Sequence, residues 1–302
     1  MSWLFFALLS YFLLAIVSIF DRYLLAGPMP NPAAYAFYVG ILWFAVAAML
    51  LPLGVVVPVG TGLFLGLLAG FLRILAILFL VKSIFTGEVG RVVPAIGGLV
   101  PIFAFILFFL AAPYGEALGI YQAIAFLLLV CGSVMISQKN FSSRAIRLDE
   151  LRYPIVSAFL FALSFFLTKS VFLETNFTSG LLVILLGGGL GALSFLLWPE
   201  LRRSIVQHQT KRSVSFLFLL GQAIGGAGVF CQFYAIFLAK PFQVPLVNAL
   251  EGVRYIFLLL FIYLFSLNNP FLLKEEIRGA HISQKILAVL LISIGIFILA
   301  IR

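Results

Sequence analysis

The chain has 302 residues, a formal net charge of +9, 64% hydrophobic and 10% charged residues, and a mean hydropathy of +1.23. An average globular domain is ~45–50% apolar and ~25% charged, so this composition excludes an ordinary water-soluble fold and indicates a helical membrane protein. The basic residues form no stripe with interleaved aromatic residues, so we expect basic loops beside an anionic leaflet and no nucleic-acid partner.

Apolar segments long enough to cross a bilayer follow one another along the whole chain, and most of the breaks fall at Pro, Gly or Asn. A spanning helix needs ~17–25 residues, so these segments predict ten transmembrane helices in a multi-pass protein of the plasma (cytoplasmic) membrane. They lie at about 3–25, 32–53, 57–83, 88–111, 118–137, 153–173, 179–198, 213–239, 243–266 and 283–301.

The longest polar interruption divides the chain into two halves that resemble each other. Val93-Pro94 corresponds to Val244-Pro245 at an offset of 151, and Asp21 corresponds to Thr168 at an offset of 147. In the last expected helix of each half, a Gln precedes a Gly-containing apolar run. Each half holds five expected helices, and because five is odd the second copy enters the membrane from the opposite side.

The predicted fold is therefore an all-α integral membrane protein built from two inverted five-helix repeats. We expect the first repeat at 1–137, the second at 153–302, and a connecting loop at 138–152. Inverted repeats are the architecture of many secondary transporters, whose binding sites lie near the bilayer midplane where the repeats meet.

Basic residues indicate how the chain is oriented, because cytoplasmic loops carry an excess of Lys and Arg. With ten helices, 14 basic residues fall on one side, 3 fall on the other, and Arg73 and Arg254 lie inside the membrane. The loops at 138–152 and 199–213 are then cytoplasmic, and both termini lie outside the cytoplasm. The 14 are Arg22, Lys82, Arg91, Lys139, Arg144, Arg147, Arg152, Arg202, Arg203, Lys211, Arg212, Lys274, Arg278 and Lys285; the 3 are Lys169, Lys240 and Arg302.

The expected helix 243–266 is apolar, yet it carries Glu251 and Arg254. At ~1.5 Å per residue these charges lie ~12 and ~16 Å into the helix, near the middle of a hydrocarbon core ~30 Å thick. Each charge costs roughly 2.5–3.5 kcal/mol there, so both must face a partner or water. Asn248 and Tyr255 share this face at helical spacing, which predicts a polar stripe inside a helix bundle.

Arg73 lies near the centre of the expected helix 57–83. One interpretation is a side chain that snorkels or bonds helix-end carbonyls. The other is a substrate-binding group, because an Arg at this depth rarely faces lipid.

Glu88 and Arg91 repeat the spacing of Glu251 and Arg254 at the start of the expected helix 88–111. Near the membrane surface such a pair most simply neutralises itself within the helix. In the helix centre the same pair favours a function, because apolar residues pack there at lower cost.

Gln222 and Gln232 interrupt the expected helix 213–239, where they either bond neighbouring helices or contact a substrate. Pro94, Pro101 and Pro245 are expected inside membrane helices, where a proline frees backbone carbonyls and forms a structural kink or a gating hinge.

The stretch from Glu88 to Ser137 resembles the EamA domain of the drug/metabolite transporter superfamily. The resemblance is carried by Pro101 in a short helix, Gly115-Glu116 at the following turn, and then Gln122 and Gly132. The second half repeats the pattern more loosely through LVNALEGVRYIFLLL, Glu275/Glu276, Gln284 and Gly295.

This resemblance implies two inverted five-helix bundles around a central cavity. The cavity would be lined by the first, third, fourth, sixth, eighth and ninth helices, with the fifth and tenth at the periphery. Members of the family usually have cytoplasmic termini, whereas the charges here indicate the reverse, so the orientation stays open. The substrate-binding candidates on the lining helices are Arg73, Glu88, Arg91, Gln222, Gln232, Asn248, Glu251, Arg254 and Tyr255.

The function expected from these observations is secondary transport of a small polar metabolite, either an amino acid-like zwitterion or a small organic anion. We expect no catalytic residues, metal site or cofactor, and coupling to protons or sodium stays open. Two alternatives are a membrane-embedded lipid-modifying enzyme and a lipid-scrambling or structural membrane protein. The enzyme would need paired Asp residues or a His beside a carboxylate, and the sequence shows neither arrangement.

Overall fold

The computed structural model describes residues 2–26, 31–53, 55–86, 89–111, 119–137, 148–206, 212–266 and 282–301, and every regular element in these ranges is helical. Three short 3-10 helices, η1 (Leu51–Leu53), η2 (Phe195–Leu197) and η3 (Pro241–Gln243), adjoin longer ones. The α-helices are α1 (Ser2–Ala26), α2 (Pro32–Leu50), α3 (Thr61–Thr86), α4 (Val89–Ala111), α5 (Ile120–Ser137), α6 (Leu148–Glu174), α7 (Phe177–Ser194), α8 (Pro199–Val206), α9 (Arg212–Leu238), α10 (Val244–Ala249), α11 (Glu251–Ser266) and α12 (Ile282–Ile301).

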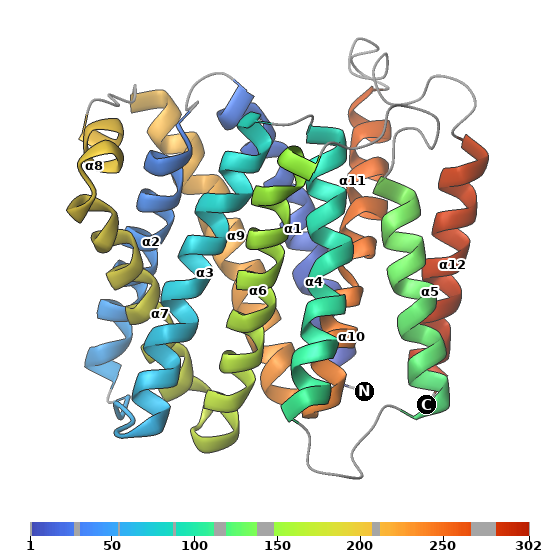
Figure 1. Ribbon diagram of the computed structural model, residues 1–302, viewed down its shortest axis with the longest axis horizontal. Coiled ribbons are helices and arrows are strands. Elements are labelled where there is room, and N and C mark those ends of the chain that lie inside the picture. The colour runs from blue at the N-terminus through green and yellow to red at the C-terminus, as the bar shows by residue number, and fades with distance from the viewer. Residues whose placement is uncertain are drawn as a thin grey trace.

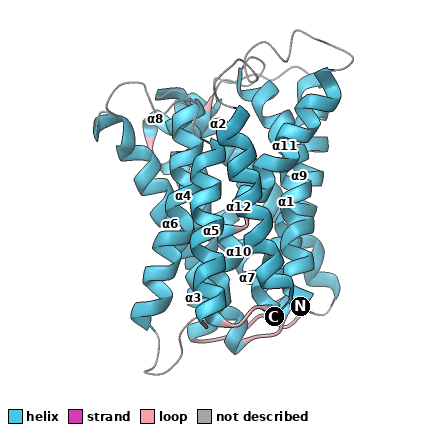
Figure 2. Ribbon diagram, turned by 90° about the vertical axis from the view of Figure 1, so that its right-hand side faces the viewer, coloured by secondary structure: helices cyan, strands magenta, loops and turns pink. Residues whose placement is uncertain are grey.

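Among the described residues, six helices are long and apolar enough to cross a membrane: α1, α2, α3, α6, α7 and α9. Shorter apolar stretches occupy parts of α4, α5 and α12. The long helices stand side by side, and both ends of the chain lie near the same end of the bundle (Figures 1 and 2). The protein is therefore an all-α membrane protein, while the count of ten spanning helices stays a prediction.

Three local differences separate the structure from the expected segments. The segment expected at 243–266 is broken at Leu250 into α10 and α11. The short helix α8 follows α7 where a loop was expected. Residues 148–152, expected in the connecting loop, are the first turn of α6, and residues 138–147 lie outside the described ranges.

The α3–α6 contact is one of the two most extensive helix contacts, the other being α1–α9. Two serines of α6 fasten it, because Ser157 Oγ donates to the Ala76 carbonyl and Ser164 Oγ to the Ala69 carbonyl, each at 2.9 Å. The α3–α6 contact and the α1–α9 contact each join a helix of the first expected repeat to a helix of the second. The two halves of the chain therefore interleave and share a single core.

Glycines let α3 and α7 approach backbone to backbone. A side chain at Gly70 would meet the backbone of Ile184, and one at Gly187 would meet the backbone of Leu67. Small residues at a helix contact let membrane helices pack closely. This contact is a fixed part of the wall around the interior.

The helices α5 and α12 pack against each other at one edge of the bundle (Figures 1 and 2). Their contact is reciprocal: a side chain at Gly132 would meet Ile292 and Ala288, and one at Gly295 would meet Leu129 and Ala125. Each of these positions in α5 has its counterpart 163 residues later in α12. Such self-complementary packing is what a two-fold relation produces locally, and the inverted repeat over the whole chain stays a prediction.

Candidate polar site at the broken helix

The break at Leu250 turns backbone carbonyls toward side chains of other helices. The Val253 N–H bonds the Leu250 carbonyl, three residues back instead of four, at 2.9 Å. The carbonyl of Val247 accepts from Tyr11 Oη at 2.9 Å, and that of Ala249 accepts from Ser133 Oγ at 3.3 Å. Hydroxyls from α1 and α5 thus satisfy carbonyls at the break, as a broken helix inside a membrane requires.

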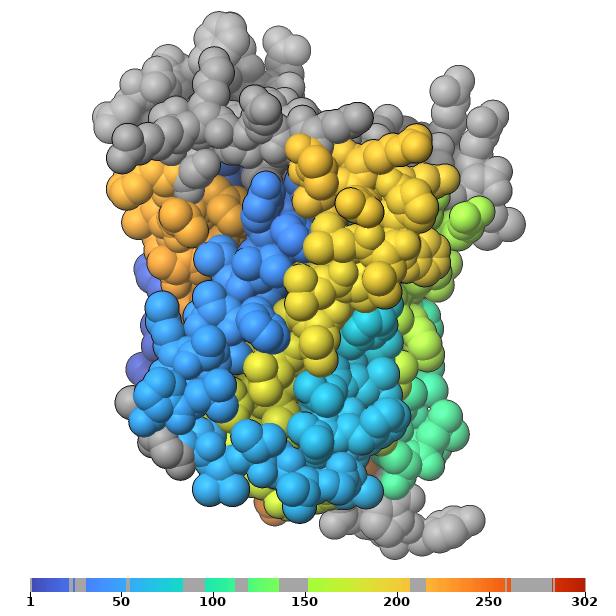
Figure 3. Space-filling view, turned by 90° about the vertical axis from the view of Figure 1, so that its left-hand side faces the viewer, coloured from blue at the N-terminus to red at the C-terminus, as the bar shows by residue number. Residues whose placement is uncertain are grey.

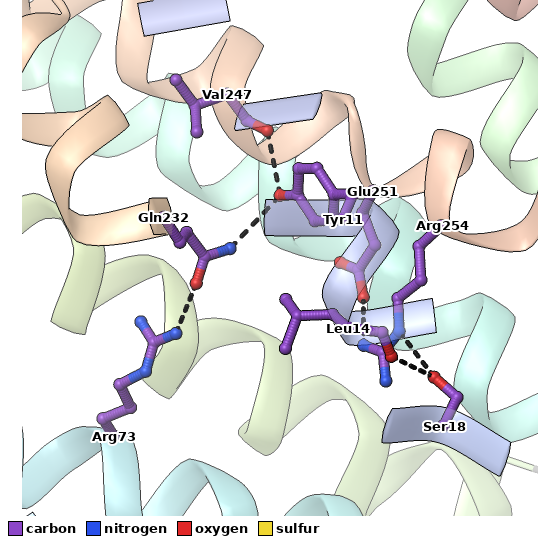
Figure 4. Close-up of polar contacts among 8 residues, drawn as sticks. All are labelled: Tyr11, Leu14, Ser18, Arg73, Gln232, Val247, Glu251 and Arg254. Carbon is purple, nitrogen blue, oxygen red and sulfur yellow. Dashed lines mark hydrogen bonds and ion pairs between the residues drawn. The ribbon is translucent and has the colours of Figure 1, made fainter. Parts of the chain in front are cut away.

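Arg73 lies at the centre of the bundle and is 5% exposed. Its Nη2 donates to Gln232 Oε1 at 2.6 Å, and Gln232 Nε2 lies 3.4 Å from Tyr11 Oη (Figure 4). The guanidinium carbon lies 4.6 Å from the ring centre of Phe165 and 4.9 Å from that of Phe233. Aromatic faces attract a desolvated cation, so Arg73 is held by rings and one amide, and no carboxylate of the described residues is in contact with it.

Arg254 and Glu251 form a second polar group beside Tyr11. Arg254 Nη1 lies 3.6 Å from Glu251 Oε1, and Arg254 Nε donates to Ser18 Oγ at 2.9 Å (Figure 4). Both charged side chains are partly exposed, at 28% and 21%. The Glu251 carboxylate is close enough to Arg73 as well as Arg254 for the charges to interact. Glu251 therefore links the two arginines electrostatically.

A third polar group joins α1, α2 and α9. Tyr35 Oη donates to Asp21 Oδ1 at 2.6 Å, and Gln222 Nε2 donates to Tyr35 Oη at 3.0 Å. Asp21 lies about one helical turn after Ser18, whose hydroxyl accepts from Arg254. Arg254 therefore has two carboxylates in its surroundings, one on its own helix and one on α1.

Among the described residues, four buried side chains keep unused hydrogen-bonding capacity: Ser10 and Thr168 at their hydroxyls, and Arg73 and Asn248 in the polar interior. Arg73 Nη1 has no partner among the described residues, and neither amide atom of Asn248, which is 1% exposed, has one. Glu251 lies about one helical turn after Asn248 and faces Gly97 of α4. A Cβ atom added at Gly97 would lie 3.7 Å from the Glu251 carboxyl carbon and 3.1 Å from Tyr255 Oη. Because Gly97 of α4 has no side chain, Tyr255 and Glu251 of α11 can approach that helix closely.

The structure brings together most of the site residues predicted from the sequence. Arg73 and Gln232 are bonded, and Glu251, Arg254, Asn248 and Tyr255 share the broken helix. Gln222 lies apart from Arg73, in the group with Tyr35 and Asp21. Arg73 and Arg254 belong to different hydrogen-bonded groups that meet at Tyr11 and Glu251.

The remaining predicted residues lie in or near α4 and α10. Glu88 is outside the described residues, and Arg91 and Pro94 lie in α4 with side chains outside them. Pro101 is buried inside α4, as expected. Pro245 lies in the first turn of α10, where proline removes no helical hydrogen bond, so it does not kink a helix as predicted. The break comes five residues later, at Leu250.

Sequence reasoning missed Tyr11, the aromatic rings around Arg73, and the roles of Asp21 and Lys169. Lys169, counted among the three basic residues on the non-cytoplasmic side, is 4% exposed in α6, and its Nζ donates to the carbonyls of Ile236 and Phe237 at 3.3 and 3.1 Å. It thereby satisfies carbonyls at the end of α9, where helices leave them unbonded. A search for every charge inside an apolar segment would have found Asp21 and Lys169; nothing in the sequence distinguishes Tyr11.

No protein-family model matches the sequence, and no curated protein matches it. A solved structure described as "Crystal structure of protein" is similar in fold, with a TM-score of 0.67 and 14% identity over 99% of this chain and 95% of that chain. At this identity the likeness extends to the fold alone. The arrangement of helices is thus found in another protein over almost its full length.

Proposed function

We propose that this protein is a secondary transporter of the drug/metabolite transporter type, with EamA-like halves. It moves a small polar metabolite, an amino acid-like zwitterion or a small organic anion, across the plasma membrane by alternating access. The resemblance of the sequence to EamA domains motivates the family, and the polar interior motivates the substrate class.

The observation that supports this proposal most is the unused bonding capacity at the broken helix. Leaving a buried polar group unbonded costs ~1–3 kcal/mol, and more for a charged one. Arg73 Nη1 and the Asn248 amide carry this cost beside a chain of bonded groups, in which Arg73 Nη2 bonds Gln232 and Tyr11 bonds the carbonyl of Val247, the residue before Asn248. A ligand with an anionic group and a hydrogen-bonding group relieves both costs when it binds.

The charges favour Arg73 as the group that binds the anionic part of a substrate. Arg254 is compensated by Glu251 on its own helix and by Asp21 on α1. Arg73 contacts an amide and aromatic rings, and Glu251 reaches it only electrostatically. A substrate carboxylate or phosphate completes the coordination of Arg73, and Glu251 of the neighbouring polar group receives an ammonium group.

The proposal is tested first by ligand binding and then by flux. The purified protein is screened for thermal stabilisation by amino acids and small organic anions, and each stabilising compound is then tested for uptake into liposomes. We expect a stabilising compound that is transported by the wild type and that no longer stabilises Arg73→Gln. Arg152→Gln, an exposed arginine near the start of α6, is the matched control. A fluorescent lipid in the same liposomes reports scrambling, which would replace transport as the function if it alone were observed.

A further inference from the structure

The short helix α8 lies at the boundary of the membrane. The candidate span that contains α7 ends at Leu197, and α8 begins two residues later. Figure 1 shows α8 at the end of the bundle opposite the termini, and Figure 3 shows its residues (gold) at the surface beside α2 (blue). Its side chains therefore meet the zone of lipid headgroups.

One face of α8 is fastened to the rest of the protein. Ile205 is buried and Leu201 packs against the core, one turn apart. Asn31 Nδ2 donates to the Ser204 carbonyl at 2.7 Å, and Ser204 Oγ donates to Asn31 Oδ1 at 3.0 Å. The orientation of α8 is thus fixed, and so is the face that it turns outward.

The outward face combines apolar and cationic side chains. One stripe of this face consists of residues four apart, Trp198, Arg202 and Val206. Trp198 precedes the first residue of α8 but keeps the helical spacing, because the Arg202 N–H donates to its carbonyl at 2.9 Å. Trp198 is 66% and Val206 69% exposed, and Arg202 and Arg203 are exposed beside them. Within the described chain, neither arginine has an ion-pair partner.

We propose that this outward face of α8 is a binding site for the headgroup of an anionic phospholipid. The two guanidinium groups bind the lipid phosphate, for which their fork of donors is suited, and Trp198 and Val206 contact the glycerol and the first acyl carbons. Glu200 is the only acidic residue of α8, so the helix carries a net positive charge complementary to an anionic leaflet. Trp is favoured at this depth because its ring is apolar and its N–H is polar.

Lipid binding at α8 also stabilises the start of α2, through Asn31. The same Asn31 Oδ1 that accepts from Ser204 caps α2, accepting from the N–H groups of Ala33 and Ala34 at 3.0 and 3.1 Å. A lipid that fixes the position of α8 therefore also fixes Asn31, and with it the hydrogen bonds that cap the first turn of α2. The effect is independent of any substrate and does not depend on the proposed transport function.

The test uses the full chain in lipid nanodiscs, with Trp3→Phe and Trp43→Phe so that Trp198 is the only tryptophan and its fluorescence can be excited selectively. Brominated phosphatidylglycerol and brominated phosphatidylcholine are compared as quenchers at equal mole fraction. Each surface arginine contributes ~1 kcal/mol toward an anionic leaflet, which is about fivefold in preference. We therefore expect phosphatidylglycerol to be preferred at least about fivefold, and the preference to fall toward one in Arg202→Gln/Arg203→Gln or in high salt. Arg152→Gln, which removes an exposed arginine elsewhere, should keep the full preference.

Equal quenching by the two lipids in the wild-type α8 would overturn the proposal, as would an unchanged preference in the double arginine variant. If the tryptophan substitutions unfold the protein, native mass spectrometry of the wild-type chain counts retained phosphatidylglycerol instead. The double variant should then retain fewer anionic lipids than Arg152→Gln does, and equal retention would overturn the proposal. Inorganic phosphate at millimolar concentration should not displace the lipid, and displacement would show that a free anion site is present instead.

Discussion

The contact between α3 and α7 differs from the contact between α2 and α9. In the first, Gly70 and Gly187 bring the two backbones together with no room for a side chain. In the second, large rings fill the space: Tyr35 lies 5.7 Å from Phe218 between ring centres, and Trp43 lies 6.2 Å from Phe233. Direct backbone contact fixes α3 against α7, whereas aromatic side chains separate the backbones of α2 and α9.

The inverted repeat expected from the sequence would make these two contacts equivalent, because it relates the third helix to the eighth and the second to the seventh. Their difference therefore locates where the two halves depart from symmetry. Polar groups also accompany the looser contact, since Gln222 bonds Tyr35 there and Arg73 lies beside Phe233. If the protein alternates between two states, we expect α2 and α9 to move relative to each other, and α3 and α7 to move as a unit.

The largest effect should come from breaking the tight contact. A side chain at Gly70 overlaps backbone atoms of Ile184 and Gly188, which cannot be repacked by a rotamer change. Gly70→Leu should therefore abolish the stable, monodisperse protein in size-exclusion chromatography. Gly226→Ala in α9 is the control, because a side chain there meets nothing within 4 Å. Wild-type thermal stability in Gly70→Leu would show that α3 and α7 are not fixed together.

The next largest effect should come from Arg73, which lies beside the looser contact, and from Arg254 in the neighbouring polar group. Arg73→Ala and Arg254→Ala should reduce flux to background while the protein still inserts and folds, since each removes a cation from the polar interior. Glu251→Gln should lower substrate affinity or thermal stability, because Glu251 compensates Arg254. The readouts are flux in liposomes and the unfolding temperature, with Arg152→Ala as control. Unchanged flux in both alanine variants would mean that the polar interior is structural.

The sequence predicted the membrane class, the positions of the long helices, and most of the charged interior. It did so because apolar length and a charge inside an apolar segment are local signals, which need no knowledge of the neighbours. One helix over 243–266 with a kink at Pro245 was expected, and the break at Leu250 was not predicted, because the carbonyls of the break are satisfied by Tyr11 and Ser133 from distant parts of the chain. The hydrogen bonds that join α8 to the start of α2 come from Asn31 and Ser204, which are far apart in the sequence, so no local pattern predicts them.

A smaller effect should follow from removing the Tyr35 hydroxyl, which joins α2 to both α1 and α9. The hydroxyl donates to Asp21 and accepts from Gln222, so Tyr35→Phe loses two hydrogen bonds without changing the ring. We expect a loss of about 1–3 kcal/mol in the free energy of unfolding, measured by reversible denaturation in mixed micelles. Tyr38→Phe on the same helix is the control, because its hydroxyl makes no hydrogen bond in the described structure. Equal losses in the two variants would mean that the bonds to Asp21 and Gln222 do not hold α2.

The smallest effect should come from replacing one of the aromatic rings that separate α2 from α9. Phe218 meets Tyr35 and Tyr38 edge to face, and aromatic pairs of this kind contribute about 0.5–1.5 kcal/mol beyond their buried area. Phe218→Leu should therefore lower the free energy of unfolding by roughly 1 kcal/mol, less than Gly70→Leu and less than Tyr35→Phe. Phe216→Leu makes the same chemical change two residues away on a side chain that is 70% exposed, so it should leave stability unchanged. If Phe218→Leu unfolded the protein as Gly70→Leu is expected to, the contact between α2 and α9 would be as rigid as that between α3 and α7, and the proposed movement would have to lie elsewhere.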